Sequence, residues 1–382
     1  MRVLIAGGGT GGHLFPGIAL AEEVVTRHPK NDVVFVGTTR GLEARVVPQN
    51  GFVFEPITSR GLKGMGPVKL ALGLLTLPVS FFEALSLVRR YRPDVVVGVG
   101  GYSSGPVVMA AWLLGVPTAV QEQNALPGLT NKLLGRLVKS VFLSFDDTTR
   151  FFPRGKSHVL GNPIRRALLD NFLKPSTAHE KFTVLVFGGS LGARGLNTRV
   201  VEALEHLAGK KDSLRIVHQT GKADLETVKQ GYSGKGFDAD VREFIDDMSA
   251  AYLSSDLVVC RAGATTVAEL TTCKKASILV PFPFATDDHQ AVNAKALVEA
   301  GAALMFREAE LTGEKLATAI LSLEADRTRL KAMEKAAGSL GRPEAAREIA
   351  DVLQQMCLVK WGALTGQKRE GEPLRPKKTG ET

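Results

Sequence analysis

The sequence predicts an α/β protein made of two doubly wound domains, and three observations carry this prediction. Short β-rich runs alternate with helical stretches along most of the 382 residues, as in parallel sheets with helical crossovers. The chain has 40 glycines but only 6% aromatic residues, which suits many tight turns between strands and helices. Its length is about two and a half times that of an ordinary domain, so two hydrophobic cores are expected.

The strand-like runs fall into two series, each of which opens with a glycine turn. The first series comprises residues 3–6, 33–36, 95–99, 118–121 and 141–143. The second series comprises residues 183–187, 215–218, 241–244, 257–260 and 276–280. Asn162-Pro163 lies between the two series and marks the expected linker.

The C-terminal part is expected to add helices and then a tail. A helical stretch over 316–340 ends at Gly341-Arg342-Pro343, and one more helix follows. We therefore expect an N-terminal domain at 1–161, a C-terminal domain at 162–341, a helix at 342–358 that returns to the N-terminal domain, and a disordered basic tail at 359–382.

The net charge of +9 lies mostly in the first half, where residues 1–160 hold seventeen Lys and Arg against ten Asp and Glu. This excess indicates either a solvated basic face or contact with phosphates, nucleic acid or acidic lipid. The three cysteines, Cys260, Cys273 and Cys357, form no metal-like or paired spacing. We expect a reducing cytoplasm, and no signal peptide because a strand begins at once.

Two long uncharged runs test for membrane spans. Residues 70–82 are too few to cross a bilayer, and residues 95–121 are broken by glycines and prolines. No transmembrane helix is therefore expected. The apolar, basic-flanked segment 62–92 suits contact with a membrane surface, although a core-facing helix at 68–88 fits the same pattern.

The first glycine turn, Gly7-Gly8-Gly9-Thr10-Gly11-Gly12, fits the G-x-G-x-x-G pattern of dinucleotide sites. The second strand of such sites ends in an acidic residue, whereas this one runs into Gly37-Thr38-Thr39-Arg40. Backbone N–H groups at a helix start can still hold a phosphate. His13 follows the turn directly, and this position favours a functional role over a structural one.

Two further turns suggest a nucleotide site in the second half. Residues 188–192 form a possible anion nest, with the Ser190 hydroxyl as an extra donor. Residues 260–269 have the pattern of a strand, a glycine turn and a helix start, and Glu269 lies about one turn inside that helix. Its carboxylate could accept hydrogen bonds from a ribose diol, or it could simply complement the helix dipole.

Seven motifs, in order and spacing, closely resemble the MurG family, bacterial transferases that place N-acetylglucosamine on the lipid-linked muramyl-pentapeptide precursor of peptidoglycan. The resemblance covers residues 1–357. The motifs are GGTGGHLFPG at 8–17, GGYSSGP at 100–106, EQN at 122–124 with GLTNK at 128–132, GNPIR at 161–165, GGSLGA at 188–193, RAGATTVAE at 261–269 and DHQ-x-x-NA at 288–294.

The resemblance implies a GT-B fold, in which two Rossmann-like domains face each other across a cleft. It also implies a UDP-N-acetylglucosamine donor held mainly by the C-terminal domain. By position, Ile245 would meet the uracil through its backbone and Glu269 would hold the ribose, while Ser190 and the helix start would meet the diphosphate. The full set of implied donor-binding residues is Thr10, Gly11, Gly12, Asn124, Arg165, Ser190, Ile245, Ala264, Thr265, Thr266, Val267, Ala268, Glu269 and Gln290.

The implied reaction is an inverting displacement at the anomeric carbon by the muramyl 4-hydroxyl, which gives a β-1,4 link and UDP. His13 is the first candidate for the base and Glu122 the second. Helix N-termini and Arg165 would stabilise the departing diphosphate, and the acidic doublets lack an Asp-x-Asp spacing, so neither a metal nor a cofactor is predicted.

The expected partners are UDP-N-acetylglucosamine, the undecaprenyl-linked muramyl-pentapeptide and an anionic membrane surface. The expected place is the cytoplasmic face of the bacterial inner membrane, as a peripheral protein acting in cell-wall synthesis. Nucleic acid is not expected, because no aromatic stacking platform or basic recognition helix is visible. The alternatives are another GT-B nucleotide-sugar transferase, a dinucleotide-dependent oxidoreductase, or a non-catalytic membrane adaptor, for which a second phosphate nest would be superfluous.

Overall fold

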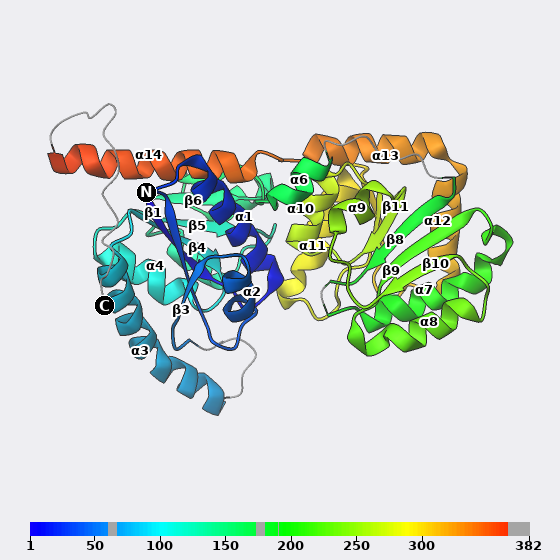
Figure 1. Cartoon of the computed structure of the whole chain (residues 1–382), viewed down its shortest axis with the longest axis horizontal. Coiled ribbons are helices and arrows are strands. Elements are labelled where there is room, and N and C mark those ends of the chain that lie inside the picture. The colour runs from blue at the N-terminus through cyan, green and yellow to red at the C-terminus, as the bar shows by residue number, and fades with distance from the viewer. Residues whose placement is uncertain (60–66, 173–179, 190, 366–382) are drawn as a thin grey trace. The chain divides into compact units, whose positions relative to one another are not determined.

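The computed structural model describes residues 1–59, 67–172, 180–189 and 191–365, and the chain divides into two compact units (Figure 1). Unit 1 comprises residues 1–123, 127–165 and the part of the chain from 344 onward. Unit 2 comprises residues 124–126 and 166–343. The division falls at 165/166 and 343/344, against the expected 161/162 and 341/342.

Unit 1 is built on a parallel sheet of seven strands in the order β3-β2-β1-β4-β5-β6-β7. Its strands are β1 (Arg2–Gly7), β2 (Asp32–Gly37), β3 (Val53–Pro56), β4 (Val95–Gly100), β5 (Thr118–Glu122), β6 (Ser140–Leu143) and β7 (Ser157–Val159). Its helices are α1 (Gly11–Arg27), α2 (Glu43–Gln49), α3 (Pro67–Tyr91), α4 (Ser104–Leu113), α5 (Leu129–Leu134) and α14 (Ala345–Thr365), with a 3-10 turn at Asp146–Phe151.

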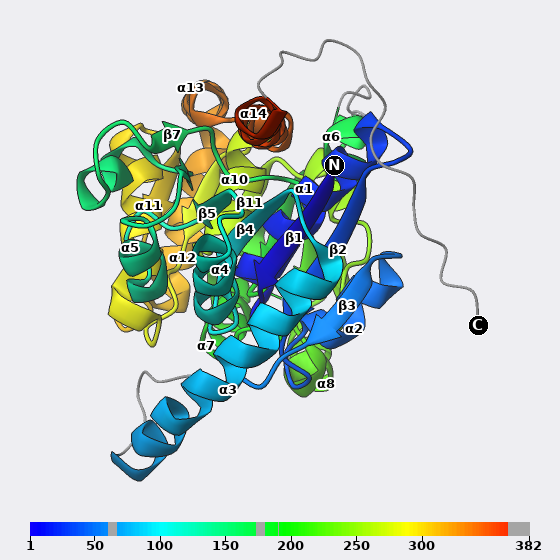
Figure 2. The ribbon, with the colours of Figure 1, turned by 90° about the vertical axis from the view of Figure 1, so that its left-hand side faces the viewer.

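The side chains of β1 alternate between two cores, one on each face of this sheet. Val3 and Ile5 pack with residues of α1 and α14, whereas Leu4 and Ala6 pack with residues of α3 and α4. Figure 2 shows α3 and α4 together on one side of the sheet. The central strands are therefore buried on both faces, which explains their continuous apolar runs.

The C-terminal helix α14 is part of unit 1. Ile349 and Leu353 are fully buried in the core that contains β1 and α1. Arg27, at the end of α1, donates to Asp351 at 2.7 Å and to the carbonyl of Arg347 at 2.5 Å. The helix ends at Thr365, seven residues beyond its expected end, and the expected tail at 366–382 lies outside the described residues.

Unit 2 is built on a second parallel sheet, in the order β10-β9-β8-β11-β12-β13. Its strands are β8 (Phe182–Phe187), β9 (Leu214–Gln219), β10 (Ala239–Arg242), β11 (Leu257–Cys260), β12 (Ser277–Leu279) and β13 (Ala303–Met305). Its helices are α6 (Arg166–Phe172), α7 (Arg194–His206), α8 (Leu225–Ser233), α9 (Met248–Leu253), α10 (Ala264–Thr272), α11 (His289–Glu299), α12 (Gly313–Ala325) and α13 (Arg327–Leu340), with 3-10 turns at Ala208–Lys210, Lys222–Asp224 and Thr286–Asp288.

Two features of the elements differ from the sequence-based expectation. The stretch 316–340 is two helices, because Asp326 ends α12 and caps α13 by accepting a hydrogen bond from the N–H of Arg329 at 2.9 Å. Strands β3, β7 and β13 were not predicted. They are three or four residues long; β3 and β7 include polar residues or proline, and β3 exposes 47% of Val53, whereas β13 is apolar but only three residues long.

Helix α3 packs one side into the core, as one of the two readings of residues 68–88 expected, and leaves other apolar residues exposed. Ala84, Leu87 and Val88 are buried in the core of unit 1, whereas Phe82 is 66% exposed and Val79 49% exposed. Among the described residues, no helix has the length and hydropathy that a membrane span requires.

Candidate active site

The first glycine turn connects β1 to α1 in unit 1. Gly8 and Gly9 have φ values of +144° and +87°, which side-chain-bearing residues rarely adopt. A Cβ atom at Gly8 would also overlap the carboxylate of Glu43. Glycine is therefore required here both for the backbone conformation and for the space that this carboxylate fills.

The carboxylate of Glu43 occupies the first glycine turn. Glu43 is the first residue of α2 and is only 1% exposed. Its Oε2 accepts a hydrogen bond from the N–H of Gly9 at 2.7 Å, and its Oε1 accepts from Thr38 N and Oγ1 at 2.9 and 3.0 Å. Sequence reasoning missed this residue, because a Glu in the first turn of a helix is ordinarily assigned to the helix dipole.

His13 lies one turn further, at the start of α1. Its Nδ1 is 3.1 Å from the Oγ1 of Thr10, and the ring is half-buried. The ring covers Gly100 at the end of β4, where a Cβ atom would come within 2.6 Å of it. The turns after β1 and β4 thus fix the position of this imidazole.

Glu122, the second candidate base, is the last residue of β5 and is 1% exposed. Its Oε2 accepts hydrogen bonds from the N–H of Gly128 at 3.1 Å and from Nδ2 of Asn131 at 2.9 Å. These bonds tie the end of β5 to the start of α5, so the carboxylate has a structural task in unit 1.

The donor candidates of unit 2 follow the carboxyl ends of neighbouring parallel strands, where ligands of doubly wound sheets bind. The turn at 188–192 follows β8, Ile245 follows β10, and α10 follows β11. Ser190 lies outside the described residues. Arg165 belongs to unit 1, where its guanidinium lies 5.1 Å from the ring centre of Phe15.

Gln219, the last residue of β9, connects the second glycine turn to Ile245. Its Nε2 donates to the carbonyl of Gly189 at 2.9 Å, and its Oε1 accepts from the N–H of Ile245 at 2.8 Å. The side chain is 3% exposed. Because the N–H of Ile245 is used in this bond, the expected contact between the Ile245 backbone and the uracil would have to use the carbonyl oxygen. Sequence reasoning did not identify Gln219.

Helix α10 begins at Ala264, so its first two turns contain the candidates Thr265, Thr266, Val267, Ala268 and Glu269. The Oγ1 of Thr265 is buried and has no hydrogen-bond partner among the described residues. Buried hydroxyls are normally paired, so this atom suits an oxygen of a ligand at the helix N-terminus.

Glu269 lies on α10 and is 8% exposed. Its Oε2 accepts a hydrogen bond from the Tyr252 hydroxyl at 3.0 Å. This second buried partner was also missed, because the two residues are separated by seventeen positions and by strand β11.

Two further candidates lie in α11 itself and on a loop that contacts it through a side chain. Gln290, in the first turn of α11, accepts a hydrogen bond through Oε1 from the N–H of Phe282 at 2.9 Å. Asn124 groups with unit 2, where its Oδ1 accepts from Nδ2 of Asn293 at 3.2 Å. Asn293 is fully buried and also accepts from the N–H of Ala125 at 2.9 Å.

Comparisons with known proteins agree on one family. The N-terminal domain of glycosyltransferase family 28 matches residues 3–143, and the C-terminal domain of that family matches residues 183–353.

A relative from Myxococcus xanthus (strain DK1622), named UDP-N-acetylglucosamine–N-acetylmuramyl-(pentapeptide) pyrophosphoryl-undecaprenol N-acetylglucosamine transferase, is 65% identical over 378 residues. The match covers 99% of this chain and 98% of the relative. A relative of the same name from Citrifermentans bemidjiense is 49% identical over 354 residues, covering 92% of this chain and 99% of the relative.

Solved structures give the same picture. The crystal structure of Acinetobacter baumannii MurG is similar with a TM-score of 0.75 at 33% identity, and the match covers 93% of this chain and 99% of that chain. The glycosyltransferase of kitacinnamycin, with a TM-score of 0.70 at 16% identity over 93% of this chain and 99% of that one, shares the fold.

Proposed function

Because this chain belongs to glycosyltransferase family 28, we propose that its two units divide one transfer reaction between them. The protein is a hexosyltransferase that moves N-acetylglucosamine from UDP-N-acetylglucosamine to undecaprenyl-pyrophosphoryl-MurNAc-pentapeptide. In our proposal, unit 2 binds the nucleotide sugar, while unit 1 supplies the base and the membrane contact.

The observation that carries the donor site is the buried carboxylate of Glu269 on the helix whose N-terminus holds the unpaired hydroxyl of Thr265. A helix N-terminus favours a diphosphate, and a carboxylate one turn later favours ribose hydroxyls. The carbonyl of Ile245 suits the N3–H of uracil. Asn124 and Gln290 would then contact the sugar, and the turn at 188–192 with Ser190 would add donors to the diphosphate.

His13 acts as the general base in this proposal. If Nδ1–H donates to Thr10, Nε2 carries the lone pair that takes the proton of the muramyl 4-hydroxyl. Base catalysis of this kind contributes about 10²- to 10⁴-fold in rate. Glu122 ranks second because its carboxylate already holds Gly128 and Asn131 in place.

Charge on the departing UDP would be stabilised by the N-terminus of α10 and by Arg165, without a metal ion. Among the described residues, no group of three or more His, Cys, Asp or Glu could hold a metal. Thr10, Gly11 and Gly12 would contribute to donor binding and would also face the pyrophosphate of the acceptor, on the N-terminal side of α1. Activity that persists in excess chelator would support this proposal.

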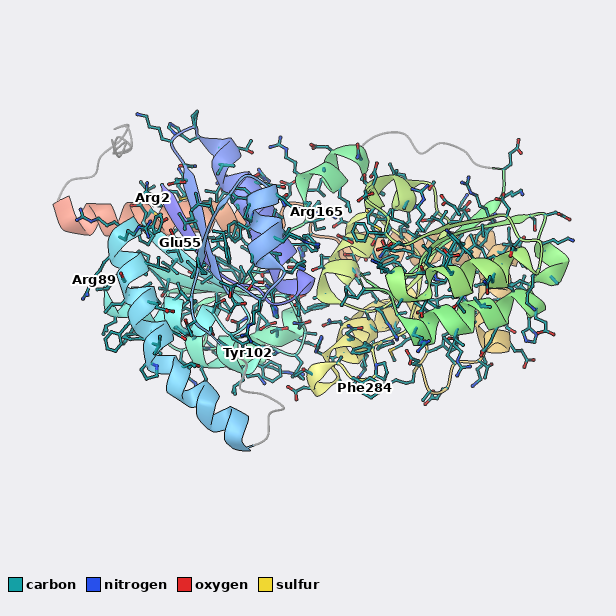
Figure 3. All side chains as sticks on the ribbon, turned by 60° about the horizontal axis from the view of Figure 1, so that its bottom comes forward. Arg2, Glu55, Arg89, Tyr102, Arg165 and Phe284 are labelled. Atoms are coloured by element: carbon teal, nitrogen blue, oxygen red, sulfur yellow. The ribbon has the colours of Figure 1, made fainter. Side chains whose placement is uncertain are left out.

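The membrane contact is proposed for the outer face of α3 and α4, which pack against each other. Exposed apolar residues gather there: Leu77, Val79 and Phe82 on α3, and Met109, Trp112 and Leu113 on α4. Arg89 and Arg90 end α3, and Arg89 projects away from it (Figure 3). Apolar area and basic charge together favour peripheral binding to anionic lipid on the cytoplasmic face.

One assay tests the reaction and its geometry. We expect UDP release from UDP-N-acetylglucosamine to require the lipid-linked acceptor, and the product to carry the β configuration at the new bond. Release that does not depend on the acceptor, or an α product, would contradict the proposal. An active transferase places the protein in peptidoglycan synthesis, and through it in cell shape and division.

A further inference from the structure

Tyr252 is a buried neighbour of Glu269, the residue proposed to hold the ribose. The side chain is 0% exposed, and its hydroxyl is 3.0 Å from Oε2 of Glu269. The two residues belong to different helices, Tyr252 to α9 and Glu269 to α10. Tyr252 is not among the residues expected to bind the donor.

The Tyr252 hydroxyl can only act as a donor toward this carboxylate. Burial, and then the nearby charge of Glu269, raise the pKa of the phenol well above its ordinary value of 10. The phenol therefore keeps its proton at every pH at which the enzyme is folded and active. An O–H donor facing a carboxylate oxygen forms a strong, directional hydrogen bond.

The position of Tyr252 is fixed by its own surroundings. Helix α9 is capped by Asp247, whose Oδ1 accepts from the N–H of Ala250 at 3.0 Å. The Tyr252 ring meets Phe187 edge-on, with 6.0 Å between centroids. The carbonyl of Tyr252 accepts from Oγ of Ser255 at 3.0 Å. The hydroxyl is therefore held in place before any ligand arrives.

The segment that leads into α9 also contains Ile245, which is proposed to contact the uracil. Ile245 lies seven residues before Tyr252, and its N–H is held by Gln219. The distance between the proposed contacts to uracil and ribose is thus set by one short, internally bonded stretch, 245–252, together with the Tyr252–Glu269 bond. A carboxylate can accept several hydrogen bonds at once, so this bond is compatible with bonds from a ribose.

We propose that Tyr252 is a positioning residue that makes the donor site selective for a nucleotide bearing a ribose 2′-hydroxyl, by holding the Glu269 carboxylate in the orientation that accepts from the sugar. This inference rests on the proposed role of Glu269. Without the phenol, the carboxylate loses one hydrogen bond that fixes its orientation, and binding of the ribose hydroxyls must order it further.

The test measures binding of UDP and 2′-deoxy-UDP by calorimetry to the full chain, carrying Tyr252→Phe, Glu269→Gln or Tyr232→Phe. Tyr232→Phe is the matched control, because it removes a buried phenol of unit 2 that contacts His218 at 3.0 Å instead of Glu269. We expect Tyr252→Phe to weaken UDP binding about three- to tenfold and 2′-deoxy-UDP binding less than about twofold. The KM for the donor should rise while kcat stays within about twofold.

The outcomes separate this inference from the donor assignment. If Glu269→Gln reduces the preference for UDP over 2′-deoxy-UDP and Tyr252→Phe does not, the positioning role of Tyr252 is wrong and the ribose assignment stands. If neither substitution changes the preference, the ribose assignment is wrong and the positioning role falls with it. An equal loss of preference in Tyr232→Phe would show a general packing effect and would also overturn the proposal.

Discussion

The two glycine turns follow equivalent strands in the two units, yet they are filled in different ways. In unit 1, the carboxylate of Glu43 accepts the N–H of Gly9 and is buried in the turn. In unit 2, Gln219 donates to the carbonyl of Gly189, and its Oε1 accepts from the N–H of Ile245, outside the turn.

The difference teaches what each turn can do. A buried carboxylate in the first turn accepts the N–H of Gly9, as a phosphate does in a dinucleotide site, so a substrate pyrophosphate is left with the later part of the turn, Thr10 to Gly12. The first turn is then a fixed scaffold for His13. In the second turn the N–H of Gly192 donates to the carbonyl of Gly189 at 3.0 Å, and in our proposal this turn adds donors to the diphosphate of the nucleotide sugar. A dinucleotide-dependent oxidoreductase would need the space that Glu43 fills, which argues against that alternative.

The largest expected effect is on turnover, and it tests the scaffold role of the first turn. We expect His13→Ala to lower kcat about 10²- to 10⁴-fold while UDP affinity stays within about twofold, because the imidazole contacts the transferred proton and not the nucleotide. Steady-state kinetics, calorimetry with UDP and a thermal melt measure these quantities. Activity near wild type would make Glu122 the better candidate, and a large drop in Tm would make His13 a structural residue.

The next largest effect is on stability, and it comes from removing the Glu43 carboxylate from the first turn. We expect Glu43→Ala to lower the free energy of unfolding by about 3 kcal/mol, because it removes a buried carboxylate together with its hydrogen bonds from Gly9 and Thr38. Denaturant unfolding followed by fluorescence would measure the change.

Glu83 provides a matched control for this substitution. It also accepts from the N–H and Oγ1 of one threonine, Thr58, but at an exposed site. We expect Glu83→Ala to cost less than about 1 kcal/mol. Equal losses for the two variants would mean that burial of Glu43 in the turn adds nothing.

The third effect is on UDP affinity, and it tests the role proposed for unit 2. Glu269→Ala should weaken UDP binding about ten- to hundredfold, since charge-assisted hydrogen bonds contribute about 1.5–3 kcal/mol. Glu43→Ala should leave UDP affinity within about twofold, provided that the variant is folded. Calorimetry on both variants decides the point. Unchanged affinity in Glu269→Ala would reduce this residue to a helix-dipole role.

The smallest expected effect concerns the membrane face of unit 1. Phe82→Gln should reduce binding to anionic vesicles several-fold, because burying an aromatic ring contributes about 25 cal/mol per Å². Phe284→Gln, which alters an exposed phenylalanine of unit 2, is the control. Vesicle flotation at low and high salt measures both variants. Equal binding by wild type and Phe82→Gln would move the docking surface away from α3.

Sequence patterns predicted the architecture because it depends on local periodicity. Strands such as 95–99 are buried on both faces and therefore appear as continuous apolar runs. The strands β3 and β7 were missed because they are short and interrupted by polar residues or proline, and the three apolar residues of β13 closely follow a helix and were not separated from it. The family resemblance, now confirmed by the comparisons, supplied the activity and the GT-B fold.

The supporting residues of the site could not be predicted from the sequence. The roles of Glu43, Gln219 and Tyr252 depend on contacts across 34, 26 and 17 positions, which only the folded chain brings together. Each of these side chains has an ordinary local explanation, as a helix-start acid, a strand-end amide or a core aromatic residue. The direct candidates, His13 and Glu269, could be predicted from the sequence because each follows a glycine turn at the start of a helix.

The return of α14 to unit 1 has a consequence for the order in which the protein can mature on the ribosome. All residues of unit 2, including 124–126, are present once residue 343 has been made. Unit 1 must wait for Ile349 and Leu353, which close the core over β1 and α1. The domain synthesised first is thus the last one finished, and a nascent chain paused before residue 345 would present an open apolar face to chaperones.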